Sequence, residues 1–147
     1  MTSSHEGSAT DAEAQAIVER NLCGLVNALS RQIEQHVRER AVALNLTAPQ
    51  ATALRELGGP LTMRELADRM ACEPSNATFV IDRLEEQGLV ERRPHPRDRR
   101  AKQLVLTPEG ITLRERLLEI LMEGSPMAGF TQEEQITLQH LLRRALS

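Results

Sequence analysis

The sequence predicts a mainly α-helical chain that carries one small β-hairpin. Three observations support this prediction. Apolar residues recur at three- and four-residue steps along most of the 147 residues, which indicates amphipathic helices. Thr residues that suit helix starts, and Gly or Pro residues that suit breaks, divide these stretches. One segment, QLVLT at residues 103–107, instead has Leu104 and Leu106 on one face and Val105 on the other, as a strand does.

The first helix is expected to follow a disordered tail at residues 1–10 and to run from about Asp11 to about Leu44. Thr10 and Glu13 have the spacing of a capping box, which marks a helix start. A helix of some 30 residues is long for a globular protein, and such length often means a partner helix from another subunit. Its apolar stripe consists of Val18, Leu22, Leu25, Leu29, Ile33 and Val37.

Two breaks lead into the second and third helices. Thr47, with Pro49 behind it, suits the start of a second helix that ends at the Gly-Gly-Pro of residues 58–60. Thr62 suits the start of a third helix, which runs to about Ala71. Leu66, Ala67 and Met70 are its expected inward residues.

A fourth helix follows after a short turn at residues 72–73. Pro74 suits its first position and Gly88 ends it, so the helix spans residues 74–87. Its buried stripe is expected to be Ala77, Val80, Ile81 and Leu84. Two short helices at a tight turn, followed by a hairpin, make a winged helix-turn-helix, in which the second helix is placed to enter a major groove.

The hairpin carries a concentration of positive charge. Its strands are expected at residues 89–90 and 103–107, and RRPHPRDRRAK at residues 92–102 forms the tip between them. The tip holds six of the 18 basic residues and one of the 21 acids, a net charge of +5 in a chain whose net charge is −3. An Arg-rich β-ribbon of this kind suits a nucleic-acid groove.

Two more helices complete the chain. Thr107 with Pro108 starts a fifth helix that ends near Glu123, and Thr131 with Glu134 starts a sixth that ends near Leu146. Pairing of two chains would bury apolar stripes that one small module cannot cover. The inward residues are expected to be Leu113, Leu117, Ile120 and Leu121 in the fifth helix, and Leu138, Leu141, Leu142 and Ala145 in the sixth.

These elements predict one domain over residues 11–147. Residues 46–106 form its DNA-binding module, and residues 11–45 and 107–147 supply dimerisation helices. The first dozen residues lack the apolar stretch of a secretory signal and no segment is apolar enough to span a membrane, so a cytoplasmic location is expected. Cys23 and Cys72 lie far apart and outside metal-binding spacings, so no metal and no cofactor are expected.

Several classes of protein are disfavoured by composition. The chain has no Tyr and no Trp, and single-strand recognition relies on aromatic platforms for base stacking. The sequence contains no Ser-His-Asp spacing, phosphate-cradling Gly loop or H-E-x-x-H string, so an enzyme is not expected.

The order of elements resembles the MarR family of transcriptional regulators. The wing carries the most specific motif, a D-x-R at residues 98–100 followed by a strand that reads LVLTPEG at residues 104–110. IDRLEEQGLVER at residues 81–92 resembles the family's recognition-helix end and first wing strand, and LTAPQ at residues 46–50 resembles its junction between the first two helices. The resemblance covers about residues 12–146.

The resemblance implies a homodimer in which each subunit reads half of a pseudo-palindromic operator in double-stranded DNA. Arg100 would enter the minor groove from the wing tip, and Asp98 would hold Arg100 by a charged hydrogen bond. Arg97 and Arg99 would contact DNA beside it. A repressor is the expected role, with release by a small-molecule effector left open.

The recognition helix offers further contacts on its exposed front. Asn76 suits an adenine edge, and Phe79 suits a thymine methyl group or, alternatively, a packing position. Ser75, Thr78 and Arg83 suit phosphates, which position the protein without specifying sequence.

Two other functions stay open. Cys23 resembles in position the sensing Cys of the organic-peroxide branch of the family, which predicts a thiol-based redox regulator. The Tyr hydroxyls that stabilise the thiolate in that branch have no counterpart here, which favours a packing role. The second alternative is a winged-helix adaptor that binds protein, and steep salt dependence of DNA binding would argue against it.

Overall fold

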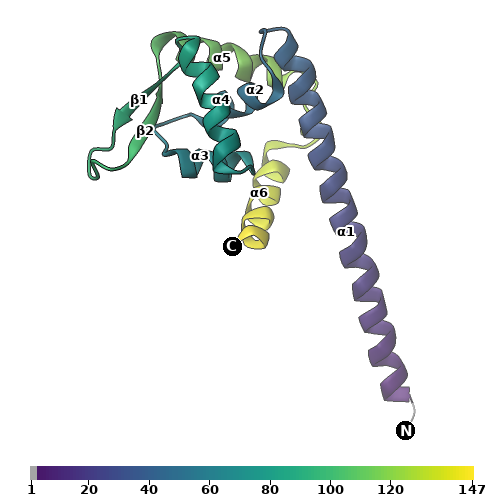
Figure 1. Ribbon diagram of the computed structural model, residues 1–147. Coiled ribbons are helices and arrows are strands. Elements are labelled where there is room, and N and C mark those ends of the chain that lie inside the picture. The colour runs from purple at the N-terminus through teal and green to yellow at the C-terminus, as the bar shows by residue number, and fades with distance from the viewer. Residues whose placement is uncertain (1–2) are drawn as a thin grey trace. The chain divides into compact units, whose positions relative to one another are not determined.

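The structure, a computed structural model, describes residues 3–147, with side chains described from Thr10 onward. The chain is mostly helical with one antiparallel hairpin, as the sequence predicted (Figure 1). Its elements are α1 (Ser3–Val42), α2 (Ala48–Glu56), α3 (Met63–Met70), α4 (Pro74–Glu86), β1 (Val90–Pro94), β2 (Lys102–Leu106), α5 (Pro108–Met122) and α6 (Gln132–Leu146).

The first helix starts earlier than expected. α1 begins at Ser3 instead of about Asp11, so Thr10 lies inside the helix and the predicted capping box is wrong. The extra residues, SSHEGSA at 3–9, include Ser and Gly, which are weak helix formers, so nothing in the sequence indicated this extension. Met1 and Thr2 lie outside the described residues, and the expected disorder of residues 1–10 stays a prediction. The chain forms two compact units, α1 up to Gln35 and His36–Ser147.

The core of the second unit lies among α2, α3, α4, α5 and the hairpin. All four residues of the predicted α4 stripe are buried, which confirms the helical register of that element. An isolated antiparallel bridge between Leu61 and Leu104 adds the segment before α3 to the edge of the hairpin. The largest fully buried side chains are Leu54, Leu57, Leu66, Ile81, Leu84, Leu104, Leu117 and Val90.

Threonine side chains cap four helix starts, each at a predicted position. Three of these caps are capping boxes, at Thr47, Thr62 and Thr131. In each, the Thr hydroxyl accepts a hydrogen bond from the backbone N–H of the residue three positions on, and the side chain of that residue accepts one from the backbone N–H of the Thr. Thr107 caps α5 with its hydroxyl alone. At α3, hydrogen bonds from Thr62 hold the pKa of the Glu65 carboxyl below its usual range. The bond from the Thr62 backbone amide has the largest effect on this pKa, followed by the bond with the Thr62 side chain.

The first wing strand is longer than the sequence suggested, and the second begins and ends one residue earlier than expected. β1 and β2 pair in antiparallel register from Val90 opposite Leu106 to Pro94 opposite Lys102. Arg92 and Arg93 therefore lie in a strand, opposite Leu104 and Gln103, and their expected place in the tip is wrong. The tip itself is residues 95–101. Within β1, the Arg92 side chain meets a carboxylate of α4 and the Arg93 side chain meets that of Glu91 on the same strand.

The helices at the two ends of the chain leave apolar side chains uncovered. α6 buries none of its residues, so the inward orientation expected for Leu141, Leu142 and Ala145 does not hold within one chain. In α1, Ile17, Val18, Leu22, Leu25 and Val26 are all exposed. Among the described residues, no helix is long and apolar enough to cross a membrane.

Candidate nucleic-acid interface

α4 is the second helix of the pair and presents two contrasting faces. Its inner face is buried against α2 and α3 through the four apolar residues of its stripe. The turn before it forms because Ala71 adopts a left-handed conformation, with φ 53°, and ends α3. The helix is thereby fixed in the module while its outer face remains open to solvent.

The outer face of α4 carries the predicted reading residues. Ser75, Asn76 and Arg83 are exposed, and 61% of Phe79 is exposed, so the packing alternative for Phe79 is wrong. Thr78 is half-buried, and its hydroxyl donates to the Pro74 carbonyl oxygen at 2.9 Å. The structure thus brings these five residues together on one helix, which is the arrangement a groove-reading helix requires.

Arg92 joins the wing to α4. Its Nη2 donates to the Asp82 carboxylate, and its Nε lies 3.6 Å from a Glu85 carboxylate oxygen. Both carboxylates belong to α4, so the positive charge of Arg92 is matched inside the protein. Arg93 is likewise paired with Glu91 on its own strand, at 3.0 Å. Arg92 and Arg93 were not among the predicted DNA contacts, although both contribute to the net charge of +5 in residues 92–102.

The wing tip is a hydrogen-bonded turn. The Arg100 backbone N–H donates to the Asp98 carboxylate at 3.0 Å, and the Ala101 N–H donates to the Asp98 carbonyl oxygen at 3.1 Å. Asp98 therefore holds Arg100 by a charged hydrogen bond, as expected, and the donor is the Arg100 backbone N–H. An Asp side chain bonds readily to the amide two residues on.

Three Arg side chains of the tip are available to bind an anion. Arg97, Arg99 and Arg100 are exposed, and within the described part of the chain none of them is in an ion pair. The structure thus separates the Arg residues of the wing into two groups. Those in β1 are neutralised by carboxylates, and those at the tip present unmatched charge to solvent.

A cleft between α4 and the wing was not anticipated from the sequence. It has a volume of 340 Å³ and is lined by Thr62, Met63, Thr78, Arg92, Ala101, Lys102 and Leu104. Lys102 is exposed and within the described residues forms no ion pair. Its contribution was missed because it appears in sequence only as the last letter of the basic run, and because the start of α3 approaches it only after folding.

The two cysteines are unpaired. Cys23 is exposed in α1, and Cys72 is half-buried in the turn between α3 and α4. No group of three or more His, Cys, Asp or Glu side chains within the described residues is arranged to hold a metal ion.

A helix pair at a tight turn, an open outer face on its second helix and an adjoining basic hairpin define a winged helix-turn-helix DNA-binding protein. Residues 46–102 match the model of the MarR family. The organic hydroperoxide resistance transcriptional regulator of Bacillus subtilis is 30% identical over 105 residues, covering 70% of this chain and 71% of that protein. The repressor MdtR of the same organism is 31% identical over 120 residues, covering 79% and 77%.

Solved structures agree with these relatives. The crystal structure of a mutant MarR from E. coli complexed with operator DNA superposes with a TM-score of 0.66 at 26% identity, covering 86% of this chain and 94% of that one. The chain belongs to the MarR family, as the sequence motifs indicated. It is a DNA-binding transcriptional regulator, and because the family consists of regulators, it is not an enzyme.

Proposed function

We propose that this protein is a homodimeric repressor that binds a pseudo-palindromic operator in double-stranded DNA. In each half-site α4 lies in the major groove, where Asn76 bonds an adenine edge and Ser75 and Thr78 hold phosphates. Arg100 enters the adjacent minor groove, with Arg97 and Arg99 on the flanking backbone. Repression would follow because the bound dimer covers promoter DNA, and the related MdtR is named a transcriptional repressor.

One observation carries this proposal: the open face of α4 and the unmatched charge of the wing tip occur in the same compact unit. α4 contacts β1, and the Arg92 pairs with Asp82 and Glu85 hold the strand against the helix. A helix in a major groove and a hairpin in the next minor groove can then engage together, without a separate ordering cost for each.

The cleft beside the wing supports the same placement. A DNA strand must pass between a major groove and the neighbouring minor groove, so its phosphates would face the space between α4 and the hairpin. Lys102 supplies a positive charge there, and the Thr62 and Thr78 hydroxyls line the same cleft. Lys is well suited to hold a phosphate as a point charge.

Dimerisation would proceed through the helices at the ends of the chain, residues 11–45 and 107–147. Leu22 and Leu25 in α1 and Leu141 in α6 are all more than half exposed in one chain. Monomeric proteins rarely leave repeated large apolar residues uncovered along a helix, and a second copy of the chain would cover them. Two symmetric copies would also supply the two half-sites of a near-palindrome.

Release by a small-molecule effector is carried over from the family resemblance. Binding of such a compound would favour a half-site spacing that does not fit the operator. The related organic hydroperoxide regulator raises the redox alternative through Cys23. We retain the effector because this chain has no Tyr to stabilise a thiolate in the manner expected for that branch.

Sedimentation equilibrium at micromolar concentration tests the dimer. The wild-type protein should sediment as a dimer, and Leu25→Asp and Leu141→Asp together should produce monomers that no longer bind operator duplex. Gln87→Asp is the control, because Gln87 is exposed and lies outside both segments. A monomeric wild-type protein that binds DNA fully would overturn the proposal. A reporter whose promoter overlaps the operator then tests repression, since a repressor must lower its transcription.

A further inference from the structure

Phe79 is an unusual residue for the outer face of α4. It is one of two Phe residues in the chain, and 61% of its surface is exposed although its neighbours Ala77 and Val80 are buried. Large apolar side chains are normally inside, and the core face of this helix is already filled. The ring therefore contributes little to the core, and its role must be sought on the outer face.

Arg83 is a close partner of the ring on that face. The guanidinium carbon of Arg83 lies 5.3 Å from the centroid of the Phe79 ring. The two residues are four positions apart on a helix, where side chains of successive turns meet. A cation at this distance over an aromatic face is attracted by the ring quadrupole.

Stacking on the Phe79 ring leaves the N–H donors of Arg83 available for hydrogen bonds. A guanidinium has five N–H donors, all in its plane, and a ring covers only its face. Arg83 is exposed, and no ion pair within the described residues uses its donors. Arg92, by contrast, forms ion pairs with two carboxylates of α4.

We propose that Phe79 is a positioning residue for Arg83, holding its guanidinium on the outer face of α4 so that its edge meets a DNA phosphate. A free Arg side chain loses rotamer freedom when it binds, and a guanidinium already resting on a ring loses less. The inference rests on the proposed function, because it assumes that α4 faces DNA. It replaces the role expected from sequence, a direct contact of Phe79 with a thymine methyl group.

A double-mutant cycle separates these two roles. Operator duplex is titrated at fixed salt with wild type, Phe79→Ala, Arg83→Ala and the double variant. An exposed cation–π contact corresponds to about a two- to fivefold change in affinity, which is the loss expected for Phe79→Ala. Arg83→Ala should lose more, and the double variant should lose no more than Arg83→Ala alone. Losses that multiply would show that Phe79 acts independently of Arg83, which overturns the inference.

Two conservative variants give a second test. Phe79→Trp keeps an aromatic face and should bind as the wild type does. Phe79→Leu keeps apolar contact but has no such face, so it should bind as weakly as Phe79→Ala. A Leu variant with wild-type affinity would overturn the inference in favour of simple apolar contact. All Phe79 variants should unfold at the wild-type temperature, because the side chain is largely exposed.

The DNA supplies a third test. Replacing thymine by deoxyuridine removes only the methyl group, one base at a time across the half-site. The fold-loss caused by Phe79→Ala should be the same on the substituted and the ordinary duplex. A loss that disappears at one deoxyuridine identifies a methyl contact and overturns the inference. If these tests fail while the wild-type dimer still selects its operator, the proposed function stands without this inference. If the wild type binds no duplex, both fail.

Discussion

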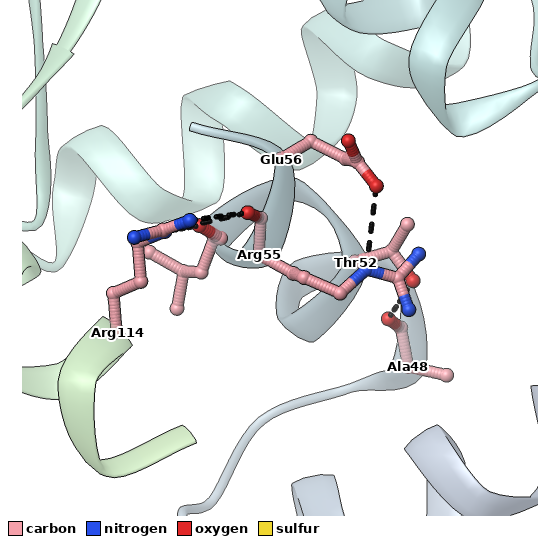
Figure 2. A network of polar contacts seen from close by, with 6 residues as sticks. Ala48, Thr52, Arg55, Glu56 and Arg114 are labelled. Atoms are coloured by element: carbon pink, nitrogen blue, oxygen red, sulfur yellow. Dashed lines mark hydrogen bonds and ion pairs between the residues drawn. The ribbon is translucent and has the colours of Figure 1, made fainter. Parts of the chain in front are cut away.

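Arg114 of α5 caps the end of α2 by donating to the carbonyl oxygen of Arg55. Its Nη2 lies 2.9 Å from that oxygen (Figure 2). Its Nε lies 2.9 Å from the Leu54 carbonyl oxygen. The last carbonyls of a helix have no partner within it, and a cation is favoured at that end of the helix dipole. The Arg55 side chain points elsewhere and pairs with Glu56 at 3.3 Å. One side chain of α5 thus anchors the first helix of the DNA-binding module.

Replacing this anchor should destabilise the whole second unit. Arg114→Ala removes charge-assisted hydrogen bonds from half-buried carbonyl groups, and such bonds contribute about 1.5–3 kcal/mol. The free energy of unfolding in urea should fall by that amount. Arg116→Ala is the matched control, because Arg116 is exposed on the same helix. Equal stability of the two variants would contradict the capping role.

Arg92 and Arg99 should differ in how they affect the salt dependence of DNA binding. Arg99 is unmatched at the wing tip, so Arg99→Ala should lower the slope of log affinity against log salt by about 1. Arg92 is paired with Asp82 and Glu85, so Arg92→Ala should leave the slope unchanged. The Arg92 pairs are partly exposed and should contribute only about 0.2–1 kcal/mol to stability. A reduced slope for Arg92→Ala would show that its charge reaches a phosphate.

The turn at the wing tip allows the roles of Asp98 and Arg100 to be separated. Arg100→Ala should weaken operator binding by about 1–3 kcal/mol and relax the preference at flanking base pairs. Asp98→Ala should weaken binding too, because the Arg100 backbone loses its acceptor. Asp98→Asn keeps a carbonyl oxygen at the same place and should retain most of the affinity. If Asn is as damaging as Ala in a titration, the carboxylate charge and not the backbone contact is what matters.

Lys102 should contribute affinity without sequence preference. Lys102→Gln removes a positive charge from the cleft beside the wing, so binding should weaken on operator and on unrelated duplexes by the same factor, with a salt slope lower by about 1. Arg93→Gln is the comparison, because Arg93 is exposed but paired with Glu91. Identical behaviour of these two variants would mean that the cleft does not face a DNA strand.

Peroxide should have no effect on DNA binding. Cys23 is an exposed thiol in α1, and the chain lacks the Tyr residues that the redox alternative relies on. Binding to operator duplex is measured before and after stoichiometric organic hydroperoxide, with Cys23→Ser as the control and intact mass as the record of oxidation. Loss of binding in the wild type alone would establish the redox alternative.

The helix starts and the buried stripe of α4 were predictable because their signals are local. Thr47, Thr62, Thr107 and Thr131 each begin a helix where the sequence placed it, since a capping residue acts on amides two or three positions away. The α4 stripe was predictable because a helix buried on one side repeats its apolar residues at a fixed step. Phe79 departs from that step, and its exposure follows from the same rule.

Other features of the structure were not predicted from the sequence, most of all contacts between residues distant along the chain. The pairing of Arg92 with Asp82 and Glu85 joins a strand to a helix, and no local pattern records it. The hydrogen bond between Asp98 and Arg100 was predicted, but the sequence did not specify its donor, because both the backbone and the side chain of Arg100 offer an N–H. The start of α1 was misjudged because the residues before Thr10 include Ser and Gly, which are weak helix formers.

In vitro selection from random duplexes tests the central claim most directly, namely that two copies of this module read a defined DNA sequence. Purified protein is mixed with the random pool at moderate salt, and the bound fraction is sequenced. The account predicts enrichment of an inverted repeat whose half-site centres lie about one helical turn, or about ten base pairs, apart. A pool that stays random while binding remains salt-sensitive would contradict it and indicate a non-specific DNA binder. Absence of any binding at low salt would instead favour the protein-binding adaptor.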